Sequence, residues 1–359
     1  MQKIYFQCDY AEGAHPKILA RLAATNLEQT PGYGEDIYCA QAAEKIRKAC
    51  KDESLAVHFL VGGTQTNLTV IDAALRAHQG VICAMTGHIN VHETGAVESC
   101  GHKILALPCG EDGKITAGQV RKVCEEHNAL GRDHMVQPGM VYLSNPTELG
   151  TIYSAAELKE MYAVCGEFGL YLFLDGARLG YGLAASDNDL TLPLLAEYTD
   201  VFYIGGTKVG ALFGEALVIG NDTLKKDFRY IMKQKGGLLA KGRLLGIQFD
   251  TLFTDNLYFE ISHHAIEMAE ELKKILEGRQ IEFYLKSPTN QQFVILENDR
   301  IRELKKEAMF SFWEKYDEGH TVIRFVTSWA TTREDLEALD RALERVYTAR
   351  QINLPHSIT

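Results

Sequence analysis

Small polar and ionisable residues follow several apolar runs in this 359-residue chain, and one of them is a single lysine. In VFYIGGTKVG, residues 201–210, an apolar run leads into two glycines and then into Lys208. Burial of an ammonium is costly, since a lysine whose pKa falls from about 10.4 to about 7.5 reflects roughly 4 kcal/mol of differential interaction. Proteins keep such lysines mainly as bases or as amines that bond to carbonyl carbons. An exposed loop lysine is the alternative.

A second apolar run ends in a carboxylate. LYLFLDGARLG, residues 170–180, places Asp175 at the end of a six-residue run, with Arg178 three positions later. A carboxylate at a strand end can hold a ligand nitrogen protonated. An aspartate that caps the following helix is the alternative, because Asp is a preferred N-cap residue.

The segment LVGGTQTNLTV could bind an anion. Gly62, Gly63, Thr64 and Thr66 follow an apolar run and open a helix, so backbone N–H groups, a hydroxyl and the positive helix end can converge on a phosphate. The segment lacks both the P-loop pattern and the dinucleotide fingerprint. An ordinary strand-to-helix turn explains it as well.

Two histidines lie four residues apart in GHINVHETGAVE. His88 and His92 could bind zinc from one helix face, but the glutamate of the usual metalloprotease pattern would follow His88 directly, and Ile89 stands there. We therefore expect no metal. His88 is better placed to form an aromatic wall or to transfer a proton beside a ligand, and a half-buried structural histidine is the alternative.

The surrounding pattern alternates short apolar runs with helical segments. Near-continuous apolar runs joined by helices predict a largely parallel sheet covered on both faces, with the chemistry beyond the carboxyl ends of its strands. The predicted strands are 56–61, 80–85, 103–108, 139–145, 170–175, 201–206 and 214–220, and the predicted helices are 40–50, 66–78, 117–130 and 154–169.

The last third of the chain differs in character. Long helices are predicted over 222–253 and 257–279, followed by a strand at 291–298, a helix at 301–316, a strand at 321–328 and a helix at 332–350. Two strands flanked by helices predict a small α+β domain. We expect residues 1–250 to form an N-terminal segment and the large α/β domain, and residues 251–359 to form the small C-terminal domain.

Composition narrows the partners and the compartment. The formal net charge of -11 argues against nucleic acids and anionic membranes, which clustered Lys and Arg residues bind. The eight cysteines have no C-x-x-C spacing, which fits reduced thiols in a cytoplasmic protein. We expect no signal peptide and no membrane helix.

Taken together, the strand ends supply the groups that pyridoxal 5'-phosphate (PLP) requires. The aldehyde needs a lysine, the ring nitrogen needs a carboxylate that keeps it protonated, and the phosphate needs a helix terminus. Lys208, Asp175 and the turn at Gly63 provide these three.

The motifs PGYGED, GGTQTN, GHINVHETGAVE, LDGARLG and GGTKVG, in this order, resemble the threonine aldolase branch of the β-eliminating lyase family. The resemblance covers nearly the whole chain. It implies the PLP-dependent fold type I, which is aspartate aminotransferase-like, and a homotetramer, a dimer of dimers with the site at a subunit interface.

The resemblance also implies roles for individual residues. The predicted roles are Lys208 for the Schiff base, Asp175 for the pyridine nitrogen, His88 for stacking on the ring, Gly63 and Thr64 for the phosphate, Arg178 and Arg324 for the substrate α-carboxylate, His134 as a second active-site histidine, Tyr33 in the N-terminal part of the site, and Lys241 for the neighbouring subunit's phosphate. Two departures concern the substrate side. Cys8-Asp9 stands where the family has Ser-Asp, and Ser144 replaces the glutamate of the family's ENT strand end.

The predicted function is that of a PLP-dependent lyase that cleaves a small β-hydroxy-α-amino acid, such as threonine or allo-threonine, into glycine and an aldehyde. His88 or His134, or water held by one of them, would accept the hydroxyl proton. The same groups support β-elimination or racemisation of another small amino acid. A non-catalytic binding protein of the same fold is the remaining alternative.

Overall fold

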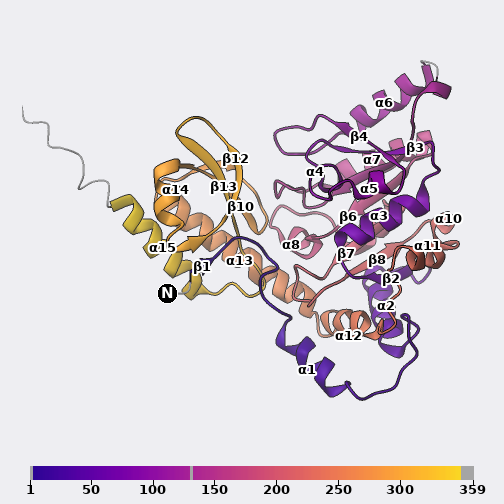
Figure 1. Ribbon diagram of the computed structural model, residues 1–359, viewed down its shortest axis with the longest axis horizontal. Coiled ribbons are helices and arrows are strands. Elements are labelled where there is room, and N and C mark those ends of the chain that lie inside the picture. The colour runs from indigo at the N-terminus through magenta and orange to yellow at the C-terminus, as the bar shows by residue number, and fades with distance from the viewer. Residues whose placement is uncertain (1–2, 130–131, 349–359) are drawn as a thin grey trace, which may run out of the picture.

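A seven-stranded mixed sheet organises the larger part of the molecule (Figure 1). The computed structural model describes residues 3–129 and 132–348. Strand order is β2-β8-β7-β6-β5-β3-β4, and only β8 runs antiparallel to its neighbours. The strands are β2 (Ala56–Leu60), β3 (Gln79–Ala84), β4 (Lys103–Leu107), β5 (Gln137–Ser144), β6 (Tyr171–Asp175), β7 (Val201–Gly205) and β8 (Glu215–Ile219). The predicted, largely parallel sheet is therefore confirmed.

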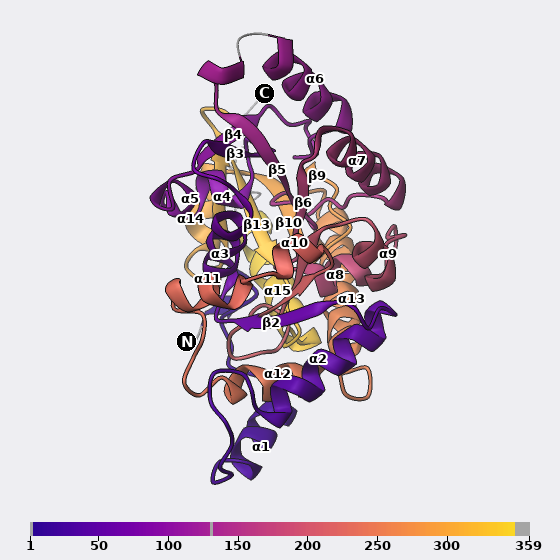
Figure 2. The same ribbon diagram turned by 90° about the vertical axis from the view of Figure 1, so that its right-hand side faces the viewer.

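Helices cover both faces of this sheet. Figure 2 shows α3, α5 and α11 on one side of it and α7, α8 and α9 on the other. The helices of this part are α1 (Pro16–Ala24), α2 (Ile37–Cys50), α3 (Gly63–Ala74), α4 (His88–Val91), α5 (Ala96–Ser99), α6 (Ala117–Ala129), α7 (Ala155–Phe168), α8 (Leu179–Ala184), α9 (Leu192–Glu197), α10 (Asp222–Lys225), α11 (Phe228–Gln234) and α12 (Arg243–Leu252), with a 3₁₀ turn η1 (Arg132–His134). The predicted helix at 117–130 corresponds to α6, and its last predicted residue, 130, lies outside the described range.

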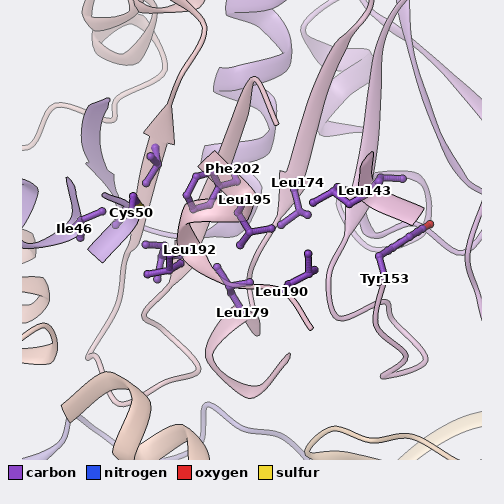
Figure 3. Packing of buried hydrophobic residues seen from close by; sticks show 14 of the residues in the cluster. Ile46, Cys50, Leu143, Tyr153, Leu174, Leu179, Leu190, Leu192, Leu195 and Phe202 are labelled. Atoms are coloured by element: carbon purple, nitrogen blue, oxygen red, sulfur yellow. The ribbon is translucent and has the colours of Figure 1, made fainter. Parts of the chain in front are cut away.

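Alternation along each strand produces two hydrophobic cores. On β5, Val141 and Leu143 belong to one core, while Met140 and Tyr142 belong to the other, since successive side chains point to opposite faces. Figure 3 shows the first core, where Leu143, Leu174 and Phe202 pack near helix residues such as Leu195. A strand buried on both faces is apolar at most of its positions, which is why these runs were recognisable.

The smaller part of the molecule is a four-stranded antiparallel sheet with order β12-β13-β10-β9. Its strands are β9 (Glu282–Leu285), β10 (Gln291–Glu297), β12 (Ser311–Lys315) and β13 (His320–Val326), and its helices are α13 (Leu257–Gly278), α14 (Asn298–Leu304) and α15 (Arg333–Thr348). The small α+β unit is confirmed. The predicted last helix extended to residue 350, and its residues 349 and 350 lie outside the described range.

Two predicted helices are wrong. The segment 301–316 is helical only to Leu304, because Ser311–Lys315 pairs with β13 as an edge strand. The segment 222–253 is divided into α10, α11 and α12. A Cβ at Gly242 would meet the Gly34 backbone nitrogen at 2.5 Å, so glycine just before α12 lets the loop before α2 approach closely.

The N-terminal segment lies on the small domain. β1 (Ile4–Tyr5) pairs in parallel with β11 (Ala308–Met309), before the chain passes to the large sheet (Figure 1). The first residues therefore pair with the small domain, and the division of the chain at residue 250 stays a prediction. Over the described residues, no helix combines the length and apolar character needed to cross a membrane.

Candidate active site

A pocket of about 330 Å³ lies at the carboxyl ends of the large-sheet strands. Ser144 at the end of β5 and Asp175 at the end of β6 are Cα partners, so the residues that follow these strands meet at one edge of the sheet. The pocket brings together six of the predicted site residues, namely Gly63, Thr64, His88, Asp175, Arg178 and Lys208.

Asp175 is a buried carboxylate held on both oxygens. Oδ1 accepts hydrogen bonds from the Tyr203 hydroxyl at 2.5 Å and the Ala177 N–H at 2.9 Å. Oδ2 accepts from the Tyr142 hydroxyl and from Asn67 Nδ2 at 3.1 Å. Burial acts to raise the pKa of Asp175, but the nearby His88 and the phenol hydrogen bonds outweigh it and lower that pKa. The carboxylate therefore stays ionised, and it is more than a helix cap.

His88 begins α4, and a second carboxylate orients its ring. Nδ1 lies 2.8 Å from Glu93 Oε1, which also accepts from Asn67 Nδ2 at 2.8 Å. An ionised carboxylate can only accept, so Nδ1 carries the proton. Asn67 thus links Glu93, the carboxylate that contacts His88, to Asp175. One hydrogen-bond network therefore fixes the His88 ring and the Asp175 carboxylate.

Lys208 follows β7 and faces the pocket. Burial lowers the pKa of Lys208, and repulsion from Arg178 lowers it further, while Asp9, Asp175 and Glu215 oppose this effect. A lysine of lowered pKa loses its proton more readily and then is a nucleophile toward a carbonyl carbon. The geometry supports the covalent role and not that of an exposed loop lysine.

The first turn of α3 is open toward the same pocket. Its N-cap residue is Gly62, and no side chain caps the helix, so the first backbone N–H groups are available to an anion. A Cβ at Gly63 would lie 3.2 Å from the Tyr203 hydroxyl. Glycine here keeps room for the phenol that holds Asp175.

Two arginines from different domains face each other near the pocket. Arg178 forms a two-point ion pair with Asp9, with Nε to Oδ2 at 2.7 Å and a terminal nitrogen to Oδ1 at 3.0 Å. Arg324, on β13, donates to Gln291 Oε1 at 2.8 Å. Burial and repulsion from Arg178 lower the pKa of Arg324 to about 10. Arg178 pairs with Asp9, whereas Arg324 interacts with Asp9 only through longer-range attraction. The two guanidiniums therefore retain positive charge for a ligand carboxylate.

Comparison with known proteins now bears on this geometry. The model of the β-eliminating lyase family matches residues 7–299. The chain belongs to the β-eliminating lyase family. Within it, the chain is 31% identical to the low specificity L-threonine aldolase of Pseudomonas aeruginosa, over 96% of this chain and 98% of that protein. The predicted resemblance is confirmed.

Solved structures agree with the fold. The structure of threonine aldolase from Leishmania major is 46% identical and superposes with a TM-score of 0.92, covering 95% of this chain and 99% of the other. Aspartate aminotransferase from Thermus thermophilus, at 13% identity, has a TM-score of 0.69 and covers 96% of this chain and 91% of the other. The second match shows the fold alone, and with the first it confirms the predicted fold type.

Five predicted residues of this β-eliminating lyase do not line the pocket, and one of them is Arg324, described above. The Cys8 Sγ lies 3.6 Å from the Tyr5 hydroxyl oxygen. Tyr33 is 46% exposed on the loop before α2 and lines a different cavity. Lys241 precedes α12 and also lines a separate hollow.

His134 is the fifth of these residues, and its role as a second active-site histidine stays a prediction. It lies in η1, before β5 begins, whereas the pocket lies beyond the end of β5. A strand of this length, eight residues, separates its two ends by roughly 25 Å. His134 could reach such a pocket only in a neighbouring subunit.

Several residues of the pocket were not predicted. Glu148 Oε1 accepts from the His88 N–H at 2.8 Å and from Ser144 Oγ at 2.6 Å, so this carboxylate occupies the neighbourhood of the family glutamate that Ser144 replaces. The sequence contains a signal for Tyr142 and Tyr203, because a tyrosine within an apolar strand needs a buried hydrogen-bond partner for its hydroxyl. The sequence contains no comparable signal for Glu215 apart from its place next to Gly214.

His92 was considered only as a metal ligand. Its ring lies 5.4 Å from that of His88. Among the described residues, no group of three or more His, Cys, Asp or Glu side chains is arranged to hold a metal ion. Burial lowers the pKa of His92, and so do His88, Arg324 and Arg178. The lowered pKa keeps the His92 imidazole neutral near pH 7, so it can accept a proton.

Proposed function

We propose that this lyase is PLP-dependent and cleaves β-hydroxy-α-amino acids of the threonine type into glycine and an aldehyde. The observation that carries the proposal is the meeting of Lys208, Asp175 and Arg178 around one pocket beside an open helix N-terminus. The names of the Pseudomonas and Leishmania relatives support the substrate class.

The residues present fit the cofactor. Asp175, ionised and buried, suits the ring nitrogen, and the first turn of α3 suits the phosphate. Lys208 suits the aldehyde, since the pKa of its ammonium is lowered by burial. When bound, PLP supplies an electron sink for the charge left on the substrate α-carbon.

The chain itself would bind and orient the amino acid. Arg178 and Arg324 hold the α-carboxylate, with Asp9 keeping the Arg178 fork in place. His88, whose ring Glu93 fixes, forms one wall of the pocket. The proton of the β-hydroxyl then passes to an imidazole of the His88 and His92 pair, the second of which has a lowered pKa.

The experiment that tests the proposal measures products from a panel of amino acids. Purified protein loaded with PLP should release acetaldehyde and glycine from L-threonine and L-allo-threonine, and serine should yield little pyruvate. Borohydride reduction should fix the pyridoxyl group on the peptide that contains Lys208. Fixation on another lysine, or pyruvate as the main product, would refute this proposal.

We also propose a homotetramer in the cytoplasm. Tyr33 and Lys241 lie outside the pocket of their own chain, which fits a role at a neighbouring subunit's site. All eight cysteines are free, which favours a reducing compartment. Light scattering gives the mass in solution, and a monomer at micromolar concentration would refute the assembly.

A further inference from the structure

The side-chain amide of Gln291 is a buried polar group of the small domain that contacts Arg324. Gln291 opens β10 and is fully buried. Phe293, two residues later, is the Cα partner of Arg324 on β13, so Gln291 and Arg324 are diagonal neighbours on one face of the small sheet. Gln291 Oε1 accepts a hydrogen bond from Arg324 Nη1 at 2.8 Å. Because a guanidinium can only donate, this contact also fixes which end of the amide faces Arg324.

The two arginines of the site differ in how their charge is balanced. Arg178 forms a two-point ion pair with Asp9, so a carboxylate already matches its charge. The terminal nitrogens of Arg324 donate instead to Gln291 and, at 3.4 Å, to the Ser311 hydroxyl. Both of these acceptors are uncharged. These contacts hold Arg324 in place without neutralising it.

Unsatisfied donors remain beside this contact. Among the residues that the structure describes, Arg324 Nε and Gln291 Nε2 are buried nitrogens without a hydrogen-bond partner. Buried donors that stay unpaired are costly, so such groups call for an acceptor. A carboxylate offers only acceptor oxygens and carries the charge opposite to that of Arg324. The neighbourhood of Gln291 therefore suits a ligand carboxylate.

The residue before Gln291 serves the other arginine. Asn290 Nδ2 donates to Asp9 Oδ2 at 2.9 Å and to the Thr327 carbonyl at 2.8 Å. Asp9 in turn holds Arg178. Two consecutive residues thus fix both guanidiniums, Asn290 through a carboxylate and Gln291 directly.

We propose that Gln291 is a positioning residue for the substrate α-carboxylate, because it anchors Arg324 with a neutral acceptor and leaves the charge of that guanidinium to the ligand. This inference rests on the proposed function for its ligand. A glutamate of the same length at position 291 would form an ion pair with Arg324 and would compete with the substrate for it. The amide at this position therefore determines how strongly the site holds ligands that carry a carboxylate.

The test compares two replacements that separate charge from hydrogen bonding. Gln291→Glu keeps the shape and the acceptor oxygen and adds a negative charge, whereas Gln291→Met keeps the length and removes the acceptor. We expect Gln291→Glu to weaken carboxylate binding about ten- to a hundredfold, the usual range for a charge-assisted hydrogen bond, and more than Gln291→Met does. A residue that only supported the fold would give the opposite order, because the glutamate retains the hydrogen bond to Arg324.

A matched pair of amines gives a readout without turnover. Glycine carries the carboxylate, and methylamine is glycine without it. Titration of each amine into the PLP-loaded protein, followed by the visible spectrum of the cofactor, gives the two dissociation constants. We expect Gln291→Glu to bind glycine more weakly and methylamine within a few-fold of wild type. For L-threonine, KM should rise and kcat should change much less.

The control variant is Ser311→Ala, which removes the longer contact of Arg324 and adds no charge. It should change glycine binding by no more than a few-fold. Gln291→Met loses the anchor but gains no charge, so its loss of glycine affinity should lie between those of Ser311→Ala and Gln291→Glu. Thermal unfolding of each variant shows whether it folds.

The outcomes separate the two proposals. Unchanged glycine affinity in Gln291→Glu, or a larger loss in Gln291→Met than in Gln291→Glu, overturns this inference and leaves the proposed function intact. An equal loss of methylamine affinity overturns it as well, since the effect would not concern the carboxylate. Unchanged glycine affinity in Gln291→Met does the same, whether or not Gln291→Glu folds. A wild type whose spectrum responds to neither amine nor to L-threonine overturns the proposed function and this inference together.

Discussion

At the scale of single residues, Asp175 is the group whose charge matters most. We expect Asp175→Asn to lower kcat by orders of magnitude, because a neutral amide cannot hold a ring nitrogen protonated. Tyr142→Phe keeps the carboxylate and removes one donor, so it should lower kcat far less than Asp175→Asn does. Its cost in folding stability should be on the order of 1–3 kcal/mol. Steady-state kinetics, with cofactor content measured in parallel, checks the expected kcat of both variants. Turnover within a few-fold of wild type in Asp175→Asn would reduce Asp175 to a structural residue.

Arg324 tests how the substrate carboxylate is held. Its head group is anchored by Gln291, close to Arg178 across the two domains. We expect Arg324→Lys to raise KM for amino acids roughly ten- to a hundredfold, equivalent to about 1.5–3 kcal/mol, because a lysine point charge loses the two-point contact. Cofactor content and its visible spectrum should not change. An unaltered KM would place the carboxylate elsewhere.

How far the site could be predicted follows from the same logic. Lys208, Asp175 and His88 follow apolar strands, and the ends of parallel strands converge, so the sequence pattern alone brings them together. Glu148 and Glu215 were missed because their positions depend on a turn and on the single reversed strand. His134 was named only through the family resemblance, and since it precedes β5 it lies at the end of that strand away from the pocket of its own chain.

At the scale of elements, the contact between α2 and α12 depends on one glycine. A Cβ at Gly246 would lie 2.4 Å from the Cys39 backbone nitrogen. We expect Gly246→Ala to destabilise the fold by about 1–3 kcal/mol through overpacking, with a lower Tm. The control is Gly166→Ala on α7, where a Cβ meets nothing within 4 Å. That change should stabilise by about 0.5–1 kcal/mol. A drop in Tm for both variants alike would contradict the packing account.

The elements that were mispredicted share a cause. Between Glu303 and Met309 the chain is rich in helix-forming residues, yet α14 ends at Leu304, and the residues from Ser311 pair with β13. Pairing with a distant strand overrides local preference, and no local pattern reports it. The glycines at 236, 237 and 242 are the sequence signal for the break before α12. Because the residues on both sides of these glycines have helical periodicity, the segment was predicted as one helix.

At the scale of the whole molecule, Asp9 joins three parts of the chain. It is fully buried and binds Arg178 of the large domain and Asn290 of the small one. Burial acts to raise the pKa of Asp9, but Arg178 and Lys208 outweigh it and lower that pKa below the ordinary 3.8. A depressed folded-state pKa contributes stability above about pH 4, and this contribution is lost as the pH falls through the folded value.

We therefore expect Asp9→Asn to destabilise the protein at pH 7 by up to about 3–5 kcal/mol, the cost of leaving a buried charge unpaired. Its stability should also fall less steeply with acid than that of the wild type. Urea unfolding between roughly pH 3 and 7 measures both effects. As a control, Asp317→Asn removes an exposed carboxylate paired with His320 and should change little at pH 7. Parallel acid curves for Asp9→Asn and wild type would exclude the linkage.

The pairing of β1 with β11 also constrains how the enzyme is made. Domains fold from the N-terminus as the ribosome releases the chain, so the large sheet can close while residues 4 and 5 still lack their partner at 308 and 309. Until that partner emerges, the segment that carries Asp9 lacks the strand pairing that holds it beside the small domain, and only Arg178 and Asn290 can hold Asp9 itself. A nascent chain halted before residue 308 would thus have the strands of the large sheet and lack both the β1–β11 pairing and Arg324.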